Sequence, residues 1–210
     1  MLYTLYNKKI PVFIVDYNEG YGFSPPNKLL NPEFAPYGLD IPGFHKSNFF
    51  FKDWWENRLI PTSRKNFDIL HLFIKSSSLS SLAIQNFGLS LSDQYWFCPT
   101  EIKDIEWEDI NYFQNPFTTD LNLDSPLLKN NKIFSPNLST NGNLPKKWII
   151  IDDIRYLCKG TTEPFHQESI NELIASRILD KLGIPHVQYM YKNNLSFCPC
   201  FIDEKDRKSV

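Results

Sequence analysis

The chain has 210 residues, of which 42% are hydrophobic and 22% charged, and its formal net charge is −2 at pH 7. A chain of this size can bury a core and form one or two domains. A net charge so close to zero gives no electrostatic basis for binding nucleic acid or an anionic membrane surface. The N-terminal stretch MLYTLYNKKIPVFIVDY lacks the long apolar region of a signal peptide, and no window approaches about 18 uninterrupted apolar residues. We therefore expect a soluble, cytoplasmic protein that binds neither membranes nor nucleic acid directly.

The first part of the chain, residues 1–130, is rich in aromatic residues, proline and asparagine. The alternation in IPVFIVDY, residues 10–17, predicts a strand, and turn-forming residues follow it. Helical spacing and capping residues predict three helices, over residues 47–58, 63–73 and 79–87. Ser47 is a plausible N-cap of the first helix and Gly88 a C′ residue of the third. Residues 114–145 are dominated by turn formers and predict loop.

Five aromatic residues gather near the first predicted helix. They are Phe49, Phe50, Phe51, Trp54 and Trp55. We favour a core role for them over an interaction patch. Few basic residues lie among them, so stacking on nucleic acid is not indicated. Arg58 could pair with the acidic segment 101–109.

The four cysteines are spaced neither as a disulfide framework nor as the paired C-x-x-C motifs of a zinc site. They are Cys98, Cys158, Cys198 and Cys200. Reduced cysteines that fill space in the core are favoured over metal ligands. No metal site is predicted. The histidines are scattered, and no nucleophile elbow or Walker loop is present, so another class of enzyme is weakly supported.

After Pro145 the pattern changes to strands that flank one helix. KKWIII, the pair Asp152–Asp153 and IRYLCKG predict a β-hairpin over residues 146–160. Side chains alternate along a strand, so Lys159 shares a face with Leu157 at the rim of the sheet. Two more strands, over residues 187–192 and 195–202, are joined by an Asn-Asn turn.

The predicted helix between these hairpins begins near Pro164 and ends before Gly183. Residues at helical spacing form its main apolar face, namely Ile170, Leu173, Ile174, Ile178 and Leu182. Glu172 lies off this stripe, on a smaller mixed face.

The order strand, strand, helix, strand, strand predicts an α+β fold and matches the small lobe of a protein kinase. In that lobe a strand lysine contacts the nucleotide phosphates and pairs with a helix glutamate. Lys159 and Glu172 have the corresponding positions. Taken alone, a rim lysine that reaches water and a solvated glutamate are the commoner explanation.

Longer segments carry a more specific resemblance. They are residues 54–64, 88–99, 105–117 and 135–150, with RYLCKG and NELIASRILDKLGIPHVQY. On these segments the chain resembles the HipA-like serine/threonine kinases, including a bacterial group with its own N-terminal region. The resemblance implies an N-terminal HipA-like region over residues 1–130 and a kinase-like small lobe over 131–210.

The resemblance also implies an ATP site. The nucleotide lysine falls on Lys159 and the helix glutamate on Glu172, within the pair Asn171–Glu172. The phosphate-covering loop falls on residues 137–147, with Ser139, Thr140, Asn141, Gly142 and Asn143 as its candidate contacts. Gly142 permits a positive φ, and its neighbours offer hydroxyl, amide and backbone N–H groups. Without the resemblance, an ordinary surface turn is the commoner interpretation of this loop.

The large lobe of such kinases carries the catalytic aspartate and the residues that hold Mg²⁺. It would follow the hinge, near residues 201–204, so we assign no catalytic residue and expect no Mg²⁺ on this chain. The expected function is the N-terminal portion of a HipA-like kinase, inactive alone and supplying half of an ATP site. Its expected partner is a separately encoded kinase large lobe or an antitoxin-type protein, as in a toxin–antitoxin system. The alternative is a non-catalytic binding or regulatory module that pairs with a kinase large lobe or another partner protein.

Overall fold

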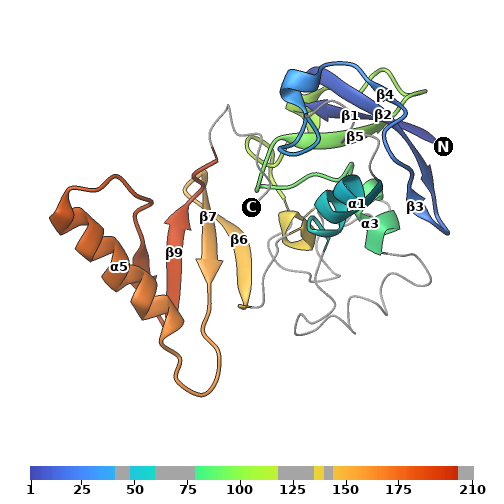
Figure 1. Cartoon of the computed structure of the whole chain (residues 1–210). Helices are drawn as coiled ribbons and strands as arrows, with labels where there is room; N and C mark the ends of the chain where they lie inside the picture. Colours follow the sequence, from blue (N-terminus) through green and yellow to red (C-terminus); the bar gives the residue numbers. More distant parts are fainter. Residues whose placement is uncertain (41–47, 60–78, 118–134, 140–143, 203–210) are drawn as a thin grey trace. The chain divides into compact units, whose positions relative to one another are not determined.

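The computed structural model describes residues 1–40, 48–59, 79–117, 135–139 and 144–202 (Figure 1). These residues form an α+β fold with antiparallel sheets and divide into two compact units. The first unit contains the described residues up to 139 together with residue 202, and the second contains residues 144–201. The predicted domain boundary after residue 130 lies outside the described residues, and residues 135–139 belong to the first unit.

The first unit is built on a sheet with the strand order β3-β2-β1-β5, in which β4 also pairs with β2. The strands are β1 (Leu2–Asn7), β2 (Ile10–Asn18), β3 (Gly22–Phe23), β4 (Lys28–Leu29) and β5 (Tyr95–Pro99). The predicted strand over residues 10–17 is confirmed as β2. Sequence reasoning missed β5, because all five of its residues are buried and it has no polar alternation.

Helices and short turns complete this unit. They are η1 (Pro32–Phe34), α1 (Asn48–Glu56), α3 (Leu79–Gln85), α4 (Trp107–Ile110) and η3 (Pro136–Ser139). The predicted helices over 47–58 and 79–87 are confirmed as α1 and α3, apart from Ser47, which lies outside the described residues. The predicted helix over residues 63–73 also lies outside them.

The aromatic residues of α1 contribute to the core of the first unit, as predicted, but not all of them do. Phe51, Trp54 and Trp55 are buried, whereas Phe49 and Phe50 are exposed. Phe51 and Trp55 both pack edge-on against Phe23 of β3. The core role is therefore confirmed for the inward side of the helix only.

Arg58 has a different partner from the acidic segment 101–109. It is buried and pairs with Asp93, and the two side chains are 3% and 0% exposed. Arg58 Nη2 also donates to the Gly88 carbonyl at 2.7 Å, and Asp93 Oδ1 accepts the Tyr95 backbone N–H at 3.0 Å. A buried charge pair with these added hydrogen bonds fixes the ends of α1, α3 and β5 to one another.

The end of α3 differs by one residue from the prediction. Phe87 donates its backbone N–H to the Ile84 carbonyl at 2.9 Å, and Gly88 donates to the Ala83 carbonyl at 2.7 Å. This is the Schellman pattern with Phe87 at C′ and Gly88 at C″. Both residues have positive φ, 56° and 62°. The predicted C′ glycine is thus the next residue of the same motif.

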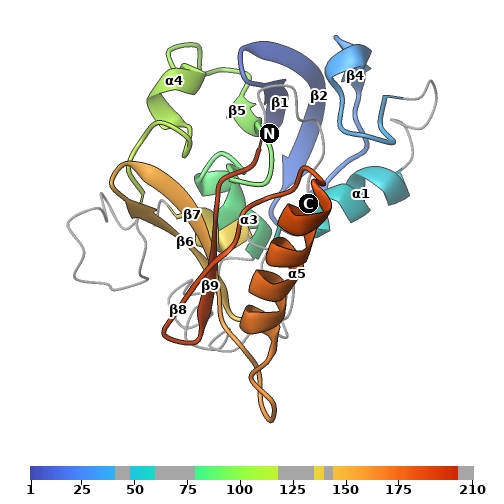
Figure 2. The same cartoon turned by 90° about the vertical axis from the view of Figure 1, so that its left-hand side faces the viewer.

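The second unit is a four-stranded antiparallel sheet with the order β6-β7-β9-β8. Its elements are β6 (Lys146–Ile151), β7 (Ile154–Lys159), α5 (Glu168–Leu182), β8 (Met190–Lys192) and β9 (Leu195–Pro199). Both predicted hairpins are confirmed, with positive φ at Asp152–Asp153 and at Asn193–Asn194. The two strands of the second hairpin are shorter than predicted, because β8 begins only at Met190 and β9 ends at Pro199. Helix α5 packs on β8 and β9 (Figures 1 and 2).

Helix α5 departs from the prediction at its start. It begins at Glu168, four residues after Pro164. The Glu168 carboxylate accepts hydrogen bonds from the Thr162 hydroxyl and, at 3.3 Å, from the Thr162 backbone N–H. These contacts hold residues 162–167 in a turn ahead of the helix. The predicted end is confirmed, because Gly183 has φ 67° and donates to the Asp180 carbonyl at 3.1 Å.

The predicted apolar face of α5 is not the face that packs on the sheet. Of its five residues, Ile170, Ile174, Ile178 and Leu182 are 40%, 49%, 51% and 64% exposed, and only Leu173 is half-buried. The buried residues of the helix are Ser169 and Ser176. The physical reason is that hydrogen bonds between polar side chains, described below, join this helix to the sheet.

Candidate functional site

Lys159 ends β7 and lies between two neighbouring strands of the second unit. It pairs with Lys146 of β6 on one side and with Ser196 of β9 on the other. Directly opposite residues of an antiparallel pair place their side chains on the same face. Lys159 and Ser196 therefore project together toward α5.

The two residues predicted for the nucleotide site meet in the structure. Lys159 Nζ donates a hydrogen bond to Glu172 Oε1 at 2.5 Å, with side chains 18% and 26% exposed. Ser196 Oγ donates to the second carboxylate oxygen of Glu172 at 2.5 Å. Ser169 Oγ donates to the Lys159 carbonyl at 3.1 Å. Strand and helix are thus joined at both the backbone and the side chain of the lysine.

A tyrosine completes the cluster. Lys159 Nζ donates to the Tyr189 hydroxyl at 2.8 Å. Tyr189 lies in the connection between α5 and β8. An ammonium group has three N–H donors. Of the contacts that the structure describes, Glu172 and Tyr189 take two, which leaves one donor for a ligand oxygen.

The environment keeps Lys159 charged. Burial lowers the pKa of its ammonium, but the hydrogen bonds to Glu172 and Tyr189 together raise this pKa by more than burial lowers it, so the pKa is raised overall. Burial raises the pKa of the Tyr189 phenol, and the nearby Lys159 only partly opposes this effect. At neutral pH the cluster therefore contains an ammonium and a neutral phenol. A fixed ammonium with a spare donor is suited to bind an anionic oxygen such as that of a phosphate.

Of the remaining predicted contacts, one belongs to the first unit and the others lie outside the described residues. Ser139 ends η3, in the first unit. Thr140, Asn141, Gly142 and Asn143 lie outside the described residues. Asn171 is exposed on α5, next to Glu172. The phosphate-covering loop therefore stays a prediction.

Sequence reasoning missed Tyr189 and Ser196. Ser196 is fully buried in the apolar strand β9. A buried hydroxyl needs a hydrogen-bond partner, so a serine inside LSFCP was the available signal. Its partner could not be named, because the pairing of β7 with β9 joins residues 37 positions apart in sequence, as Lys159 and Ser196 show.

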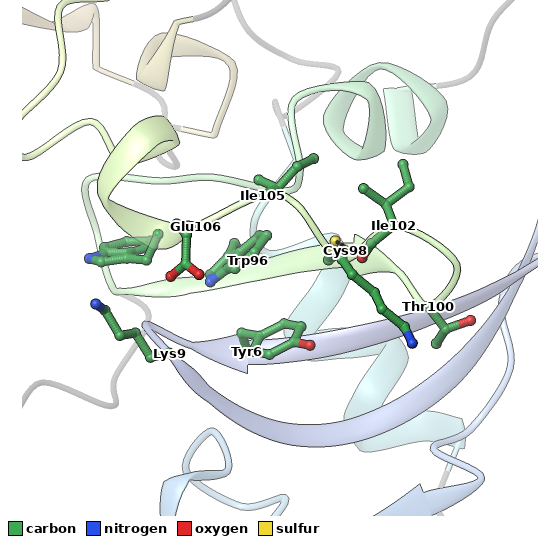
Figure 3. Close-up of a pocket in the computed structure, with 10 residues that line it drawn as sticks. Tyr6, Lys9, Trp96, Cys98, Thr100, Ile102, Ile105 and Glu106 are labelled. Carbon is green, nitrogen blue, oxygen red and sulfur yellow. Dashed lines mark hydrogen bonds between the residues drawn. The ribbon is translucent and has the colours of Figure 1, made fainter.

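A pocket of about 300 Å³ lies in the first unit, between β1, β5 and the connection to α4 (Figure 3). Tyr6 and Trp96 stack there with ring centroids 4.9 Å apart, and Trp96 Nε1 donates to the Lys8 carbonyl at 2.7 Å. Lys9 pairs with Glu108 of α4 at 3.1 Å. These contacts join β1 to β5 and α4, so they have a structural explanation. We place the candidate site at Lys159.

No protein-family model, curated protein or solved structure matches this chain. None of the described helices combines the length and apolar character needed to cross a bilayer. In the described part of the chain, no three His, Cys, Asp or Glu side chains gather as a metal site would require, and the four cysteines are free thiols. The functional argument therefore depends on the Lys159 cluster itself.

Proposed function

We propose that this chain is the N-terminal portion of a HipA-like serine/threonine kinase and supplies the lysine half of an ATP site. In this proposal residues 144–201 are a kinase-like small lobe. Lys159 contacts the nucleotide phosphates, and Glu172 holds its ammonium in place. Phosphoryl transfer requires a large lobe, which brings the catalytic aspartate and the Mg²⁺ ligands.

The observation that carries the proposal is the ion pair between a strand lysine and a helix glutamate. The two residues lie on consecutive elements, β7 and α5, and their side chains meet at 2.5 Å. A polyphosphate carries several negative charges, so a binding site needs a cation whose position is fixed before the ligand arrives. The contacts of Lys159 meet that requirement.

The test measures the binding of ATP to the purified chain in two ways, by isothermal titration calorimetry and by the shift of its thermal unfolding. If ATP binds only the folded state, a free ATP concentration of 100 times its Kd should raise the free energy of unfolding by about 2.7 kcal/mol. Lys159→Met should abolish this stabilisation, whereas Lys192→Met, at an exposed lysine of β8, should retain it. No stabilisation of the wild-type chain at millimolar ATP would refute the nucleotide site. Autophosphorylation by the isolated chain would refute the division of the site between two lobes.

A second candidate function is a non-catalytic module that binds and regulates a partner kinase. The exposed apolar stripe of α5, formed by Ile170, Ile174 and Ile178, favours this candidate. Co-purification from the native host tests it. Recovery of a kinase with the wild-type chain, and its loss from an Ile174→Glu variant, would support a regulatory module. Recovery of the same partners by both proteins would count against it.

A further inference from the structure

Tyr189 contacts the lysine of the candidate site but has no part in the expected lysine–glutamate pair. Its hydroxyl accepts a hydrogen bond from Lys159 Nζ at 2.8 Å. It reaches the ammonium from the segment before β8, whereas Glu172 reaches it from α5. Two separate elements thus hold the same charged group.

Tyr189 is itself held by several contacts. Its backbone N–H donates to Ser176 Oγ at 3.2 Å, and Ser176 Oγ lies 3.0 Å from His186 Nε2. His186 Nδ1 lies 2.8 Å from the Ile184 carbonyl oxygen. Because a carbonyl oxygen can only accept a hydrogen bond, Nδ1 must carry a hydrogen in this contact. The tyrosine is therefore fixed at its backbone and at its hydroxyl.

The chemistry of the phenol makes it a different kind of partner from the glutamate. Glu172 fixes the ammonium but also offsets its charge. Tyr189 stays neutral at neutral pH, because burial raises the pKa of its phenol. It can therefore restrict the position of Lys159 without cancelling the positive charge. A second carboxylate in its place would leave the cluster with net negative charge and repel a phosphate.

We propose that Tyr189 is a positioning residue that orients Lys159 toward a phosphate oxygen while leaving its charge intact. The part of this proposal that concerns phosphate depends on the nucleotide function proposed above. The part that concerns Lys159 does not, because the contacts are present without any ligand. Tyr189 uses one N–H donor of the ammonium and Glu172 a second, so the third donor has a defined direction.

The test compares Tyr189→Phe with Tyr191→Phe. Phenylalanine keeps the ring of Tyr189 and removes only its hydroxyl. Tyr191 is an exposed tyrosine two residues later, whose hydroxyl bonds Asn194 at 2.9 Å, so its variant is a matched control. The first readout is the pKa of Lys159, which is measured from the pH dependence of its ¹³Cε chemical shift in the ligand-free protein. This pKa should fall in Tyr189→Phe and stay unchanged in Tyr191→Phe, because the lost hydrogen bond raises it in the wild type.

The second readout is the dissociation constant for ATP, which should rise by roughly three- to ten-fold in Tyr189→Phe, the equivalent of one hydrogen bond. An unchanged Lys159 pKa in a folded Tyr189→Phe protein would overturn the positioning role. ATP binding equal to that of the wild type would overturn the phosphate-directed part of it. If the Lys159 pKa falls but the wild type binds no ATP, the positioning of Lys159 is supported and the nucleotide function is refuted.

Discussion

Replacing Glu172 by glutamine should separate the charge of the Lys159 cluster from its shape. Glutamine has nearly the same volume and keeps one carbonyl oxygen for Lys159 Nζ, but it removes the negative charge. An exposed ion pair contributes about 0–1 kcal/mol to the free energy of unfolding. Loss of one partner from a fully buried pair costs about 3–5 kcal/mol. Since Lys159 and Glu172 are 18% and 26% exposed, we expect an intermediate loss of about 1–3 kcal/mol.

Urea denaturation of both proteins measures this loss, and the pH dependence identifies its origin. The folded-state pKa of Lys159 is raised. A raised lysine pKa contributes stability that is fully present below the unfolded value of about 10.4 and is lost as pH rises through the folded value. The difference between wild type and Glu172→Gln should therefore be constant near neutral pH and shrink above about pH 10.4.

The matched control is Glu56→Gln, at an exposed pair. Lys52 and Glu56 lie 3.6 Å apart on α1 with side chains 64% and 58% exposed. Removing that pair should cost at most about 0.5 kcal/mol. The reasoning is refuted if Glu172→Gln costs no more than the control. A cost that stays unchanged as the pH rises through the folded-state pKa of Lys159 would also contradict it.

Three further variants test the contacts around the site and in the first unit. Ser196→Ala removes the hydrogen bond to the Glu172 carboxylate and should cost about 1–2 kcal/mol in urea denaturation; a cost near zero would contradict the buried contact. Asp93→Asn leaves the charge of buried Arg58 without its partner and should cost about 3–5 kcal/mol by the same measurement. Gly88→Ala should cost more than about 1 kcal/mol, since an added Cβ would lie 2.9 Å from a ring carbon of Phe97. An alanine at Gly38, which also has positive φ but meets nothing within 4 Å, should lower the melting temperature less.

The hairpins of the second unit could be predicted from the sequence because the residues that indicate their turns are neighbours in the chain. Asp152–Asp153 and Asn193–Asn194 are turn dipeptides between apolar strands, and all four residues adopt positive φ. The pairing of β1 with β5 is harder to anticipate, because it joins Tyr6 to Trp96 across most of the first unit. Strand β5 also lacks alternation, since it is buried throughout. Local turns are visible in one sequence, but non-local pairing is not.

The candidate site shows the same difference between local and non-local contacts. Lys159 and Glu172 lie on consecutive elements, so their meeting could be predicted from their order along the chain. Ser196 joins them only through the β7–β9 register, in which it lies directly opposite Lys159. Tyr189 joins them through a connection whose path depends on its bond to Ser176. The two missed residues are those whose place depends on tertiary contacts.

Helix α5 shows why the apolar pattern indicated the wrong face. Its isoleucines recur at helical spacing, which usually marks the face toward the core. Its buried residues are Ser169 and Ser176 instead, and Ser169 bonds the backbone of Lys159. Apolar packing can tolerate sliding, whereas hydrogen bonds require defined distances and angles. A helix joined to its sheet by hydroxyl and carboxylate groups therefore has one favoured position. The polar face, which the spacing of the isoleucines did not indicate, is the face that places Glu172 against Lys159.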